Sequence, residues 1–271
     1  MGCDHNCESC GGGCGKGGDS LMFALNAASR VKKVIAVASG KGGVGKSFVT
    51  ATLAAAAARR GLKVGVLDAD ITGPSIPRAF KIGHEALQGE SGIVPPVSES
   101  GVRVMSLNVL VENPSDPVVW RGPVIAGAVK QFWEEVEWGE LDVMFVDMPP
   151  GTGDVPLTVF QSLPLDGVVI VSSPQELVGM IVEKSVRMAG MLNRPVLALV
   201  ENMSYLECPD CGRRIEVFGP SRVEEVAAKY GIPRTARLPI NRDFALTVDA
   251  GRVETLFVPE MDELAAAICG R

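Results

Sequence analysis

Residues 39 to 47 of the sequence read SGKGGVGKS, a combination that is typical of a loop that binds phosphate. Its glycines would let backbone N–H groups converge on phosphate oxygens, Lys46 would neutralise the β- and γ-phosphates, and the Ser47 hydroxyl would bind Mg²⁺. Lys41 is a second cation that the pattern does not require. The residues expected around the nucleotide are Gly40, Lys41, Gly42, Gly43, Val44, Gly45, Lys46 and Ser47. A turn without a ligand is the alternative, but a predicted strand before the loop and a predicted helix after it favour phosphate binding.

Three aspartates follow predicted strands and could complete a site for a nucleoside triphosphate. Asp68 and Asp70 end the stretch VLDAD, and Asp147 lies in MFVDMPPGTGD at the expected Walker B position. In open α/β sheets, ligands bind at the carboxyl ends of the strands. We therefore expect Asp68 and Asp147, together with Ser47, to hold Mg²⁺, directly or through water. A plain role as a turn residue at the end of a strand is the alternative for Asp68.

The seven cysteines favour metal binding over disulfides. Cys208 and Cys211, in CPDCG, would supply two thiolates, which is half of a four-thiolate site, and two copies of the chain related by a two-fold axis would complete it. Tetrahedral sulfur ligation suits both an iron–sulfur cluster and zinc, so both remain open here. Four further cysteines, spaced to hold a whole cluster within one chain, are Cys3, Cys7, Cys10 and Cys14.

The composition indicates a soluble, globular protein. The net charge of −6 gives no general attraction to nucleic acid. No apolar run is long enough to span a bilayer, and the polar N-terminus lacks the order of a signal peptide, so we expect a cytoplasmic protein that binds neither membrane nor nucleic acid. Residues 1 to 20, rich in glycine and cysteine, form a predicted tail without a core of its own, and residues 21 to 271 form one predicted domain.

Uninterrupted apolar runs alternate with helical patterns from residue 33 onward, which predicts a mostly parallel, doubly wound sheet of the P-loop NTPase type with both faces covered. A hairpin is expected at 205–217. The expected strands include KVIAVAS, KVGVLDAD, VRVMSLN, LDVMFVDMPP, DGVVIVSSP and PVLALVENM. The expected helices cover a short piece at 20–31, one that ends at Gly61, one at 124–138, one from a capping box at Ser173 to about Leu192, and one at 254–269.

GKGGVGKS resembles the deviant Walker A sequence of the MinD/ParA/nitrogenase-iron-protein superclass. Together with it, VLDADITGPSIPR, DMPPGTGD, SSPQE, VENMSY and CPDCG resemble the Mrp/ApbC branch, whose members are ATPases that carry iron–sulfur clusters. The resemblance runs from about residue 32 to the C-terminus. It implies an ATP-binding and ATP-hydrolysing homodimer that assembles a cluster and hands it to recipient apoproteins.

The resemblance also implies roles for single residues. Lys41 would reach the nucleotide of the partner subunit, so that hydrolysis depends on dimerisation. Asp70 would orient the attacking water, and Asn202 would recognise the edge of adenine, unless it is simply a polar residue that ends a strand. A [4Fe-4S] cluster would bridge Cys208 and Cys211 of two subunits. The spacing of the N-terminal cysteines differs from that in the related eukaryotic cluster scaffold. The resemblance therefore does not imply a role for these four cysteines.

Two other functions compete with cluster transfer. A positioning ATPase of the MinD/ParA kind would need a basic amphipathic helix or a basic surface, whereas the C-terminal stretch VETLFVPEMDELAAAICGR is acidic to neutral. A regulatory ATPase with a structural zinc at the paired cysteines is the other possibility.

Overall fold

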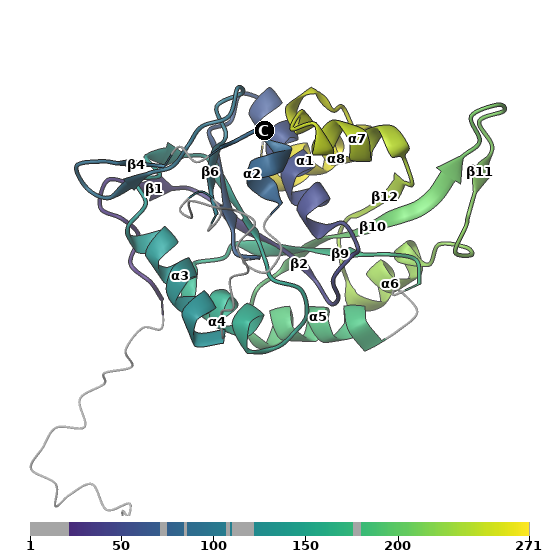
Figure 1. The fold of residues 1–271 in the computed structure, drawn as a ribbon. Coiled ribbons are helices and arrows are strands. Elements are labelled where there is room, and N and C mark those ends of the chain that lie inside the picture. Colours follow the sequence, from purple (N-terminus) through teal and green to yellow (C-terminus); the bar gives the residue numbers. More distant parts are fainter. Residues whose placement is uncertain are drawn as a thin grey trace, which may run out of the picture.

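Eight strands form one sheet in the part of the chain that the computed structural model describes, which is residues 22–70, 75–83, 86–106, 109, 122–175 and 180–270. The strands are β2 (Val34–Ser39), β3 (Val64–Asp68), β6 (Arg103–Met105), β8 (Val143–Asp147), β9 (Gly167–Ser172), β10 (Val196–Glu207), β11 (Arg214–Ile215) and β12 (Thr235–Pro239). Their order is β11-β10-β9-β2-β8-β3-β6, and β12 also pairs with β10 (Figure 1). Of these eight, β11 runs antiparallel to β10, and the other neighbours are parallel.

Helices cover both faces of this sheet, as the sequence predicts. They are α1 (Lys46–Arg59), α2 (Ile76–Ala79), α3 (Gly122–Glu134), α4 (Asp154–Ser162), α5 (Met180–Met191), α6 (Val223–Tyr230), α7 (Arg242–Asp249) and α8 (Pro259–Cys269). One hydrophobic core lies between the sheet and α1, α2 and α8, and the other lies between the sheet and α3 to α6 (Figure 1). The central strands β2, β3, β8 and β9 are buried along their whole length, because both of their faces meet helices. The predicted doubly wound, mostly parallel α/β fold is confirmed.

Short elements surround the main sheet. A small sheet pairs β1 (Arg30–Val31) with β7 (Glu140–Leu141), and another pairs β4 (Leu87–Gln88) with β5 (Ile93–Val94). Within the described residues, no helix is both long and apolar enough to cross a bilayer. The predicted tail and its four cysteines lie outside those residues.

Three of the predicted helices differ from the structure. The described part of 20–31 contains no helix, because its backbone finds distant partners: the N–H of Phe23 donates to Ser162 O, and that of Asn26 donates to Trp133 O. Instead of opening a helix, Pro174 and Gln175 form a turn, and α5 begins at Met180; Glu176 of the predicted capping box lies outside the described residues.

The predicted helix at 254–269 is divided into two. A short 3₁₀ helix at Val253–Thr255 precedes α8, which starts at Pro259. Val258, the residue before this proline, is extended, since the proline ring disfavours a helical conformation there. Proline thus places the start of α8 later than the pattern of apolar residues alone suggests.

The register of the sheet brings the predicted nucleotide-binding residues together. Asp68, the last residue of β3, pairs with Asp147, the last residue of β8. On the other side of β8, Val37 of β2 pairs with the same Asp147, and the glycine-rich loop begins shortly after Val37. The loop and both aspartates therefore meet at the carboxyl edge of the sheet.

Candidate functional site: a phosphate loop and a cysteine hairpin

The glycine-rich loop turns tightly from β2 into α1, and the backbone at Gly43 and at Gly45 adopts a left-handed conformation that favours glycine. Gly45 has a φ of 81°, in the left-handed region, and a Cβ atom there would lie 2.2 Å from Nδ2 of Asn202. The Nδ2 atom of Asn202 donates a hydrogen bond of 3.0 Å to Val44 O. Asn202 is buried on β10, so this contact ties the loop to a strand that is distant in the sequence.

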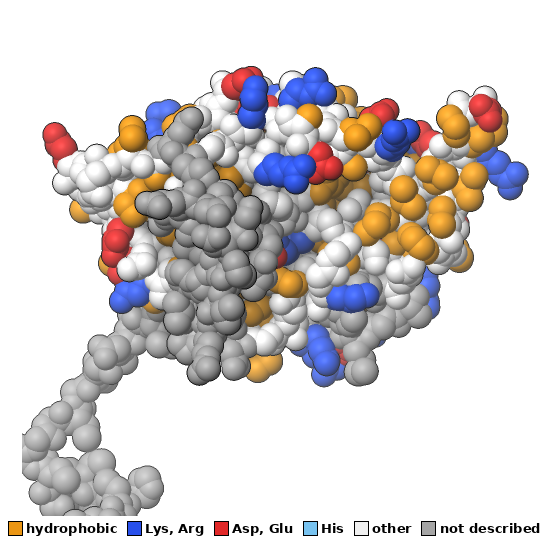
Figure 2. All heavy atoms as spheres, in the orientation of Figure 1, with side chains coloured by type: hydrophobic (Ala, Val, Ile, Leu, Met, Phe, Trp, Pro, Cys, Tyr) orange, Lys and Arg blue, Asp and Glu red, His pale blue; other side chains and the backbone are white. Residues whose placement is uncertain are grey.

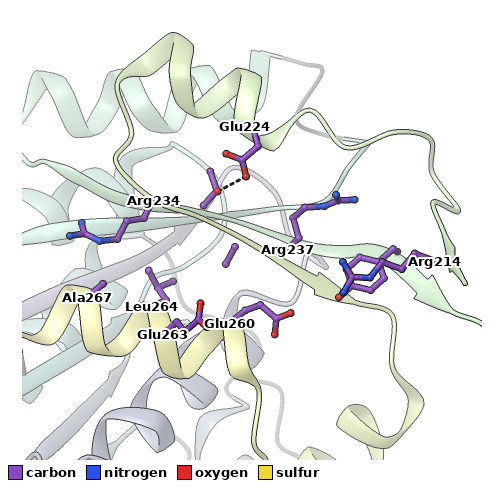
Figure 3. A pocket seen from close by; sticks show the side chains of 11 residues that line it. Arg214, Glu224, Arg234, Arg237, Glu260, Glu263, Leu264 and Ala267 are labelled. Carbon is purple, nitrogen blue, oxygen red and sulfur yellow. Dashed lines mark hydrogen bonds between the residues drawn. The ribbon is translucent and has the colours of Figure 1, made fainter. Parts of the chain in front are cut away.

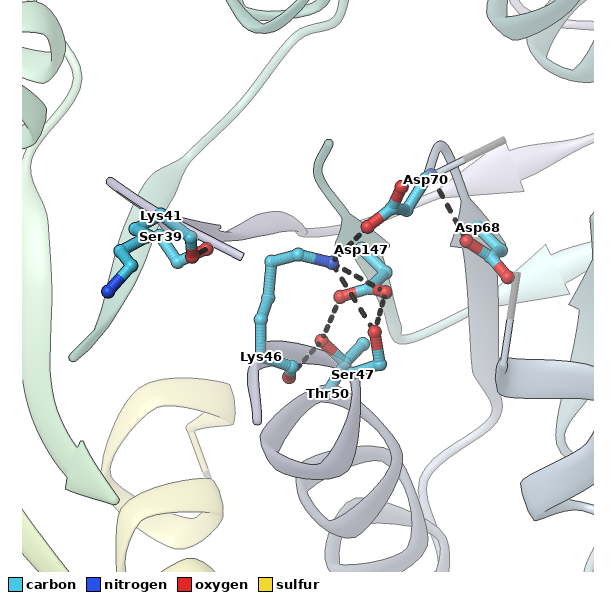
Figure 4. Close-up of polar contacts among 8 residues, drawn as sticks. All are labelled: Ser39, Lys41, Lys46, Ser47, Thr50, Asp68, Asp70 and Asp147. Carbon is cyan, nitrogen blue, oxygen red and sulfur yellow. Dashed lines mark hydrogen bonds and ion pairs between the residues drawn. The ribbon is translucent and has the colours of Figure 1, made fainter. Parts of the chain in front are cut away.

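The Lys46 ammonium lies among aspartates at the start of α1 (Figure 4). Nζ is 2.8 Å from Oδ2 of Asp147 and 3.3 Å from Oδ2 of Asp70, and the Lys46 side chain is only 6% exposed. The site thus groups Lys46 with Asp70 and Asp147, as the sequence predicts. Both ion pairs are largely shielded from water, so removing Lys46 would leave two nearly buried carboxylates without a compensating charge.

Hydroxyl groups of α1 hold both oxygens of Asp147. The Ser47 hydroxyl donates to Oδ2 at 2.6 Å, and the Thr50 hydroxyl donates to Oδ1 at 2.7 Å (Figure 4). Thr50 is fully buried and was missed by the sequence reasoning. Its position four residues after Lys46, on the same side of a helix, is the signal that could have revealed it.

Replacing Thr50 by valine removes its hydroxyl at nearly constant volume. We expect the Mg²⁺ concentration needed for half-maximal binding of a fluorescent ADP to rise about tenfold, because partners that orient a metal-binding carboxylate typically contribute 10- to 100-fold to metal affinity. The measurement is a Mg²⁺ titration of each variant. Thr52→Val is the matched control, since the Thr52 hydroxyl bonds only to carbonyls of its own helix, Phe48 O and Val49 O. An equal loss in Thr52→Val would mean that Thr50 acts only through helix stability.

Asp68 has the character of a cation ligand. Its side chain is buried, Oδ1 accepts from the N–H of Asp70 at 3.1 Å, and Oδ2 has no hydrogen-bond partner. Burial, followed by the nearby charge of Asp147, raises the pKa of Asp68 well above its usual range. Oxygen ligands from Asp68, Ser47 and Asp147 suit Mg²⁺, which would stabilise the ionised form of Asp68. The residues present therefore fit the expected metal.

Lys41 lies apart from this group. Its backbone carbonyl accepts a hydrogen bond of 2.9 Å from the Ser39 hydroxyl, which fixes the loop, and its side chain is exposed. In Figure 4 the Lys41 ammonium points away from Lys46 and from the three aspartates. The surplus cation thus faces outward from the loop of its own chain.

The paired cysteines lie where β10 turns into β11. The turn is closed by hydrogen bonds from Gly212 N to Cys208 O, at 2.8 Å, and from Cys208 N to Arg213 O, at 3.0 Å. The predicted hairpin at 205–217 is thus present, with Glu207 paired to Arg214, and it projects from the body of the molecule (Figure 1).

The chemistry of these thiols suits a metal. Cys208 is half-buried and Cys211 is exposed. Hydrogen bonds from the backbone of Asp210, and then of Cys211, lower the pKa of the Cys208 thiol and favour the thiolate. No group of three or more histidine, cysteine or acidic ligands occurs in the part of the chain that the structure describes. The described hairpin therefore brings two thiols into one turn, and their role as metal ligands stays a prediction.

Known proteins resemble this chain closely. Residues 30–269 match a family model described as ParA: NUBPL iron-transfer P-loop NTPase. An iron-sulfur cluster carrier protein of Clostridium perfringens is 48% identical over 232 residues, which is 83% of this chain and 81% of that protein. One of Methanocaldococcus jannaschii is 46% identical over 215 residues, which is 79% of this chain and 74% of the relative.

Solved structures agree with this. A nucleotide-binding protein from Archaeoglobus fulgidus, in complex with ADP, has a TM-score of 0.78 and 45% identity, and the match covers 86% of this chain and 91% of that one. The cell division ATPase MinD of Pyrococcus furiosus has a TM-score of 0.55 at 18% identity, covering 88% and 98%. At that identity the likeness to MinD concerns the fold alone, and it identifies the sheet as one of the P-loop NTPase type.

Proposed function

The chain belongs to the family of NUBPL-type iron-transfer P-loop NTPases, and on this basis we propose that it is a cytoplasmic, ATP-dependent carrier of iron–sulfur clusters. It takes a cluster from a donor and passes it to recipient apoproteins. The observation that carries the proposal is that one strand, β10, serves both chemistries: Asn202 contacts the phosphate loop, and the same strand leads directly into the turn with Cys208. Nucleic acid and membranes have no part in it.

Nucleotide binding uses the groups already gathered at the carboxyl edge of the sheet. The backbone of the loop surrounds the phosphates. The Lys46 ammonium, which contacts Asp147 in this structure, turns toward the β- and γ-phosphates. Ser47, Asp68 and Asp147 hold Mg²⁺, which neutralises charge between the phosphates when it is bound. The Nδ2 atom of Asn202 is engaged with Val44 O, so its Oδ1 atom is the one that would accept a hydrogen bond from the amino group of adenine.

Hydrolysis requires two further groups. Asp70, next to Lys46, orients the attacking water. Lys41 neutralises the charge that develops on the γ-phosphate of the partner subunit, which agrees with its outward direction from its own loop (Figure 4). ATP hydrolysis therefore takes place in a dimer.

Cluster binding also requires a dimer. A [4Fe-4S] cluster is ligated by four thiolates, and two hairpins related by a two-fold axis supply four through Cys208 and Cys211. Exposed apolar side chains lie on the hairpin and directly after it, where Figure 2 shows hydrophobic groups gathered at the right; they include Leu206, Ile215, Val217 and Phe218. A second copy would cover such a surface. The four N-terminal cysteines form a second site in this proposal.

Anaerobic reconstitution with iron and sulfide tests the function. In the full chain with Cys3, Cys7, Cys10 and Cys14 replaced by serine, we expect one [4Fe-4S] cluster per dimer, transferable to an apoprotein that needs such a cluster. Adding Cys208→Ser and Cys211→Ser should abolish both binding and transfer and leave ADP affinity unchanged, since both cysteines lie in the turn of the hairpin, outside the phosphate loop. Iron and sulfide counts and the absorption spectrum measure cluster binding.

The opposite result would favour a different function. If the chain with the intact pair at 208 and 211 binds zinc but no iron and sulfide, the hairpin is a structural zinc site and the protein is a regulatory ATPase. Zinc in a sample purified in air does not decide the matter, because tetrahedral sulfur ligation suits both metals.

A further inference from the structure

The strand that leads to the cysteines is irregular at one point. The register between β10 and β12 shifts between Glu201 and Tyr205, which marks a bulge. Within it, Met203 has a φ of 56°, in the left-handed region that non-glycine residues seldom adopt. A bulge of this kind bends a strand and re-aims the residues beyond it. The irregular segment therefore contains Asn202, which contacts the phosphate loop, and it precedes Cys208 on the same strand.

One arginine of the neighbouring strand spans this bulge. On β12, Arg237 donates from Nε to the hydroxyl of Ser204 at 2.8 Å and from a terminal nitrogen to Glu216 Oε1 at 2.8 Å. Its guanidinium also lies 5.7 Å from the ring centre of Tyr205. Ser204 and Tyr205 belong to the outgoing arm of the hairpin and Glu216 to the returning arm, so a single side chain holds both arms.

A buried carboxylate, that of Glu201, contacts both Ser204 and Arg237. Glu201 is fully buried, and its Oε1 accepts a hydrogen bond of 2.5 Å from the hydroxyl of Ser204. Arg237 Nε lies 3.8 Å from the same oxygen, while Oε2 of Glu201 has no hydrogen-bond partner. Arg237 therefore supplies the charge that compensates Glu201, the residue directly before Asn202.

The base of the hairpin is open on two sides. A cavity of about 500 Å³ lies between the hairpin, α6, β12 and α8, and is lined by Tyr205, Leu264, Arg214 and Arg237 among others (Figure 3). A second cavity of about 570 Å³ is lined by residues 213 to 216 and again by Arg237. Arg214 and Arg237 line both cavities and β11 is exposed, so the returning arm is held by side-chain contacts rather than by a packed core.

We infer that the bulge from Glu201 to Tyr205 is the hinge of the cysteine hairpin, and that Arg237 is the positioning residue that sets its angle according to the state of the nucleotide site. A ligand that moves the phosphate loop moves Asn202, and the bulge passes this displacement to the strand beyond it. Arg237 ties that strand to the sheet and to Glu216. The use of the hinge in presenting thiols to a second copy rests on the proposed function, whereas the motion itself does not.

Hydrogen–deuterium exchange of the full chain, with and without Mg²⁺ and ADP, tests the hinge. In the wild-type protein we expect the nucleotide to change amide exchange at 203–217 and at Ile240, whose N–H donates to Tyr205 O at the base of the hairpin. In Arg237→Met we expect exchange there to be roughly fivefold faster, because the local opening of the hairpin is less costly, and to respond no longer to ADP. ADP affinity, measured separately, should stay within about twofold of the wild-type value, since Arg237 does not contact the phosphate loop.

Matched variants keep the inference testable. Arg234→Met removes a neighbouring arginine that lines the same cavity but points away from the hairpin, and it should behave as wild type (Figure 3). If Arg237→Met leaves Glu201 too poorly compensated to fold, Glu216→Gln weakens the hold on the returning arm and leaves the buried contacts intact; it should also accelerate exchange at 203–217. Equal exchange in the Arg237 and Arg234 variants, or an ADP response that persists without Arg237, would overturn the role of Arg237. If the wild-type protein does not bind ADP at all, the proposed function is contradicted instead.

Discussion

The Lys41→Ala protein is expected to hydrolyse ATP about 10³-fold more slowly than the wild type, while its ADP affinity changes only a few-fold. A cation supplied to a phosphoryl group in the transition state typically contributes about 10³ or more to the rate, equal to about 4 kcal/mol of the barrier. Lys41 is exposed and points away from the carboxylates of its own site, so its loss leaves the binding groups in place. Steady-state phosphate release and equilibrium binding of a fluorescent ADP measure the two effects.

Mixing two inactive proteins shows whether Lys41 acts across the dimer. A site formed by a Lys41→Ala subunit keeps its own Asp70, and an Asp70→Ala partner can supply the missing Lys41. Half of the sites in each mixed dimer should therefore recover activity, and Lys41→Arg should retain part of the rate because it keeps the charge. Mixed dimers no more active than either parent would mean that Lys41 acts within its own chain or only on the shape of the loop.

The Lys46→Ala protein should bind ADP about 100-fold more weakly, a loss of about 3 kcal/mol, since removing one partner of a buried charge pair typically costs 2–5 kcal/mol. Lys46 lies within 3.3 Å of two carboxylates, so its loss also leaves Asp70 and Asp147 to repel an anionic ligand. Isothermal titration with ADP and Mg²⁺ measures the change.

Lys32→Ala is the control for this substitution. It removes an exposed lysine just before the amino end of β2, whereas the loop follows the carboxyl end of that strand; Lys32 pairs with Asp142 at 2.7 Å, and its loss should leave ADP affinity unchanged. Circular dichroism identifies whether the Lys46 variant is folded. A folded Lys46→Ala protein that binds ADP as tightly as the wild type would contradict the assignment of residues 40 to 47 as a phosphate loop.

The sequence alone predicted those parts of the site that depend on neighbouring residues. The loop from Gly40 to Ser47 is recognisable because its glycines serve a local backbone conformation, as the positive φ of Gly45 illustrates. The end of α1 was predicted for the same reason: Gly61 has a φ of 79° and follows the last helical residues directly. Cys208 and Cys211 are likewise close in sequence, so one turn suffices to bring them together.

Predictions from the local sequence pattern were wrong where hydrogen bonds to distant parts of the backbone decided the conformation. The stretch at 20–31 has residues that suit a helix, yet Phe23 and Asn26 donate to backbone carbonyls more than 100 residues away, and the helix does not form. Those hydrogen bonds replace the ones that a short helix would make, and a short helix is marginal without packing.

Residue types and their spacing were enough to predict the glycine-rich loop between a strand and a helix, the buried parallel strands with aspartates at their ends, and the two cysteines in one turn. Only the folded chain reveals that the Thr50 hydroxyl holds Asp147, that Asn202 contacts the loop at Val44, and that Arg237 spans the bulge below the cysteines. Each of these contacts joins groups from different strands, helices or loops. Their distances depend on how the sheet is ordered and twisted, and no local spacing of residues specifies that order.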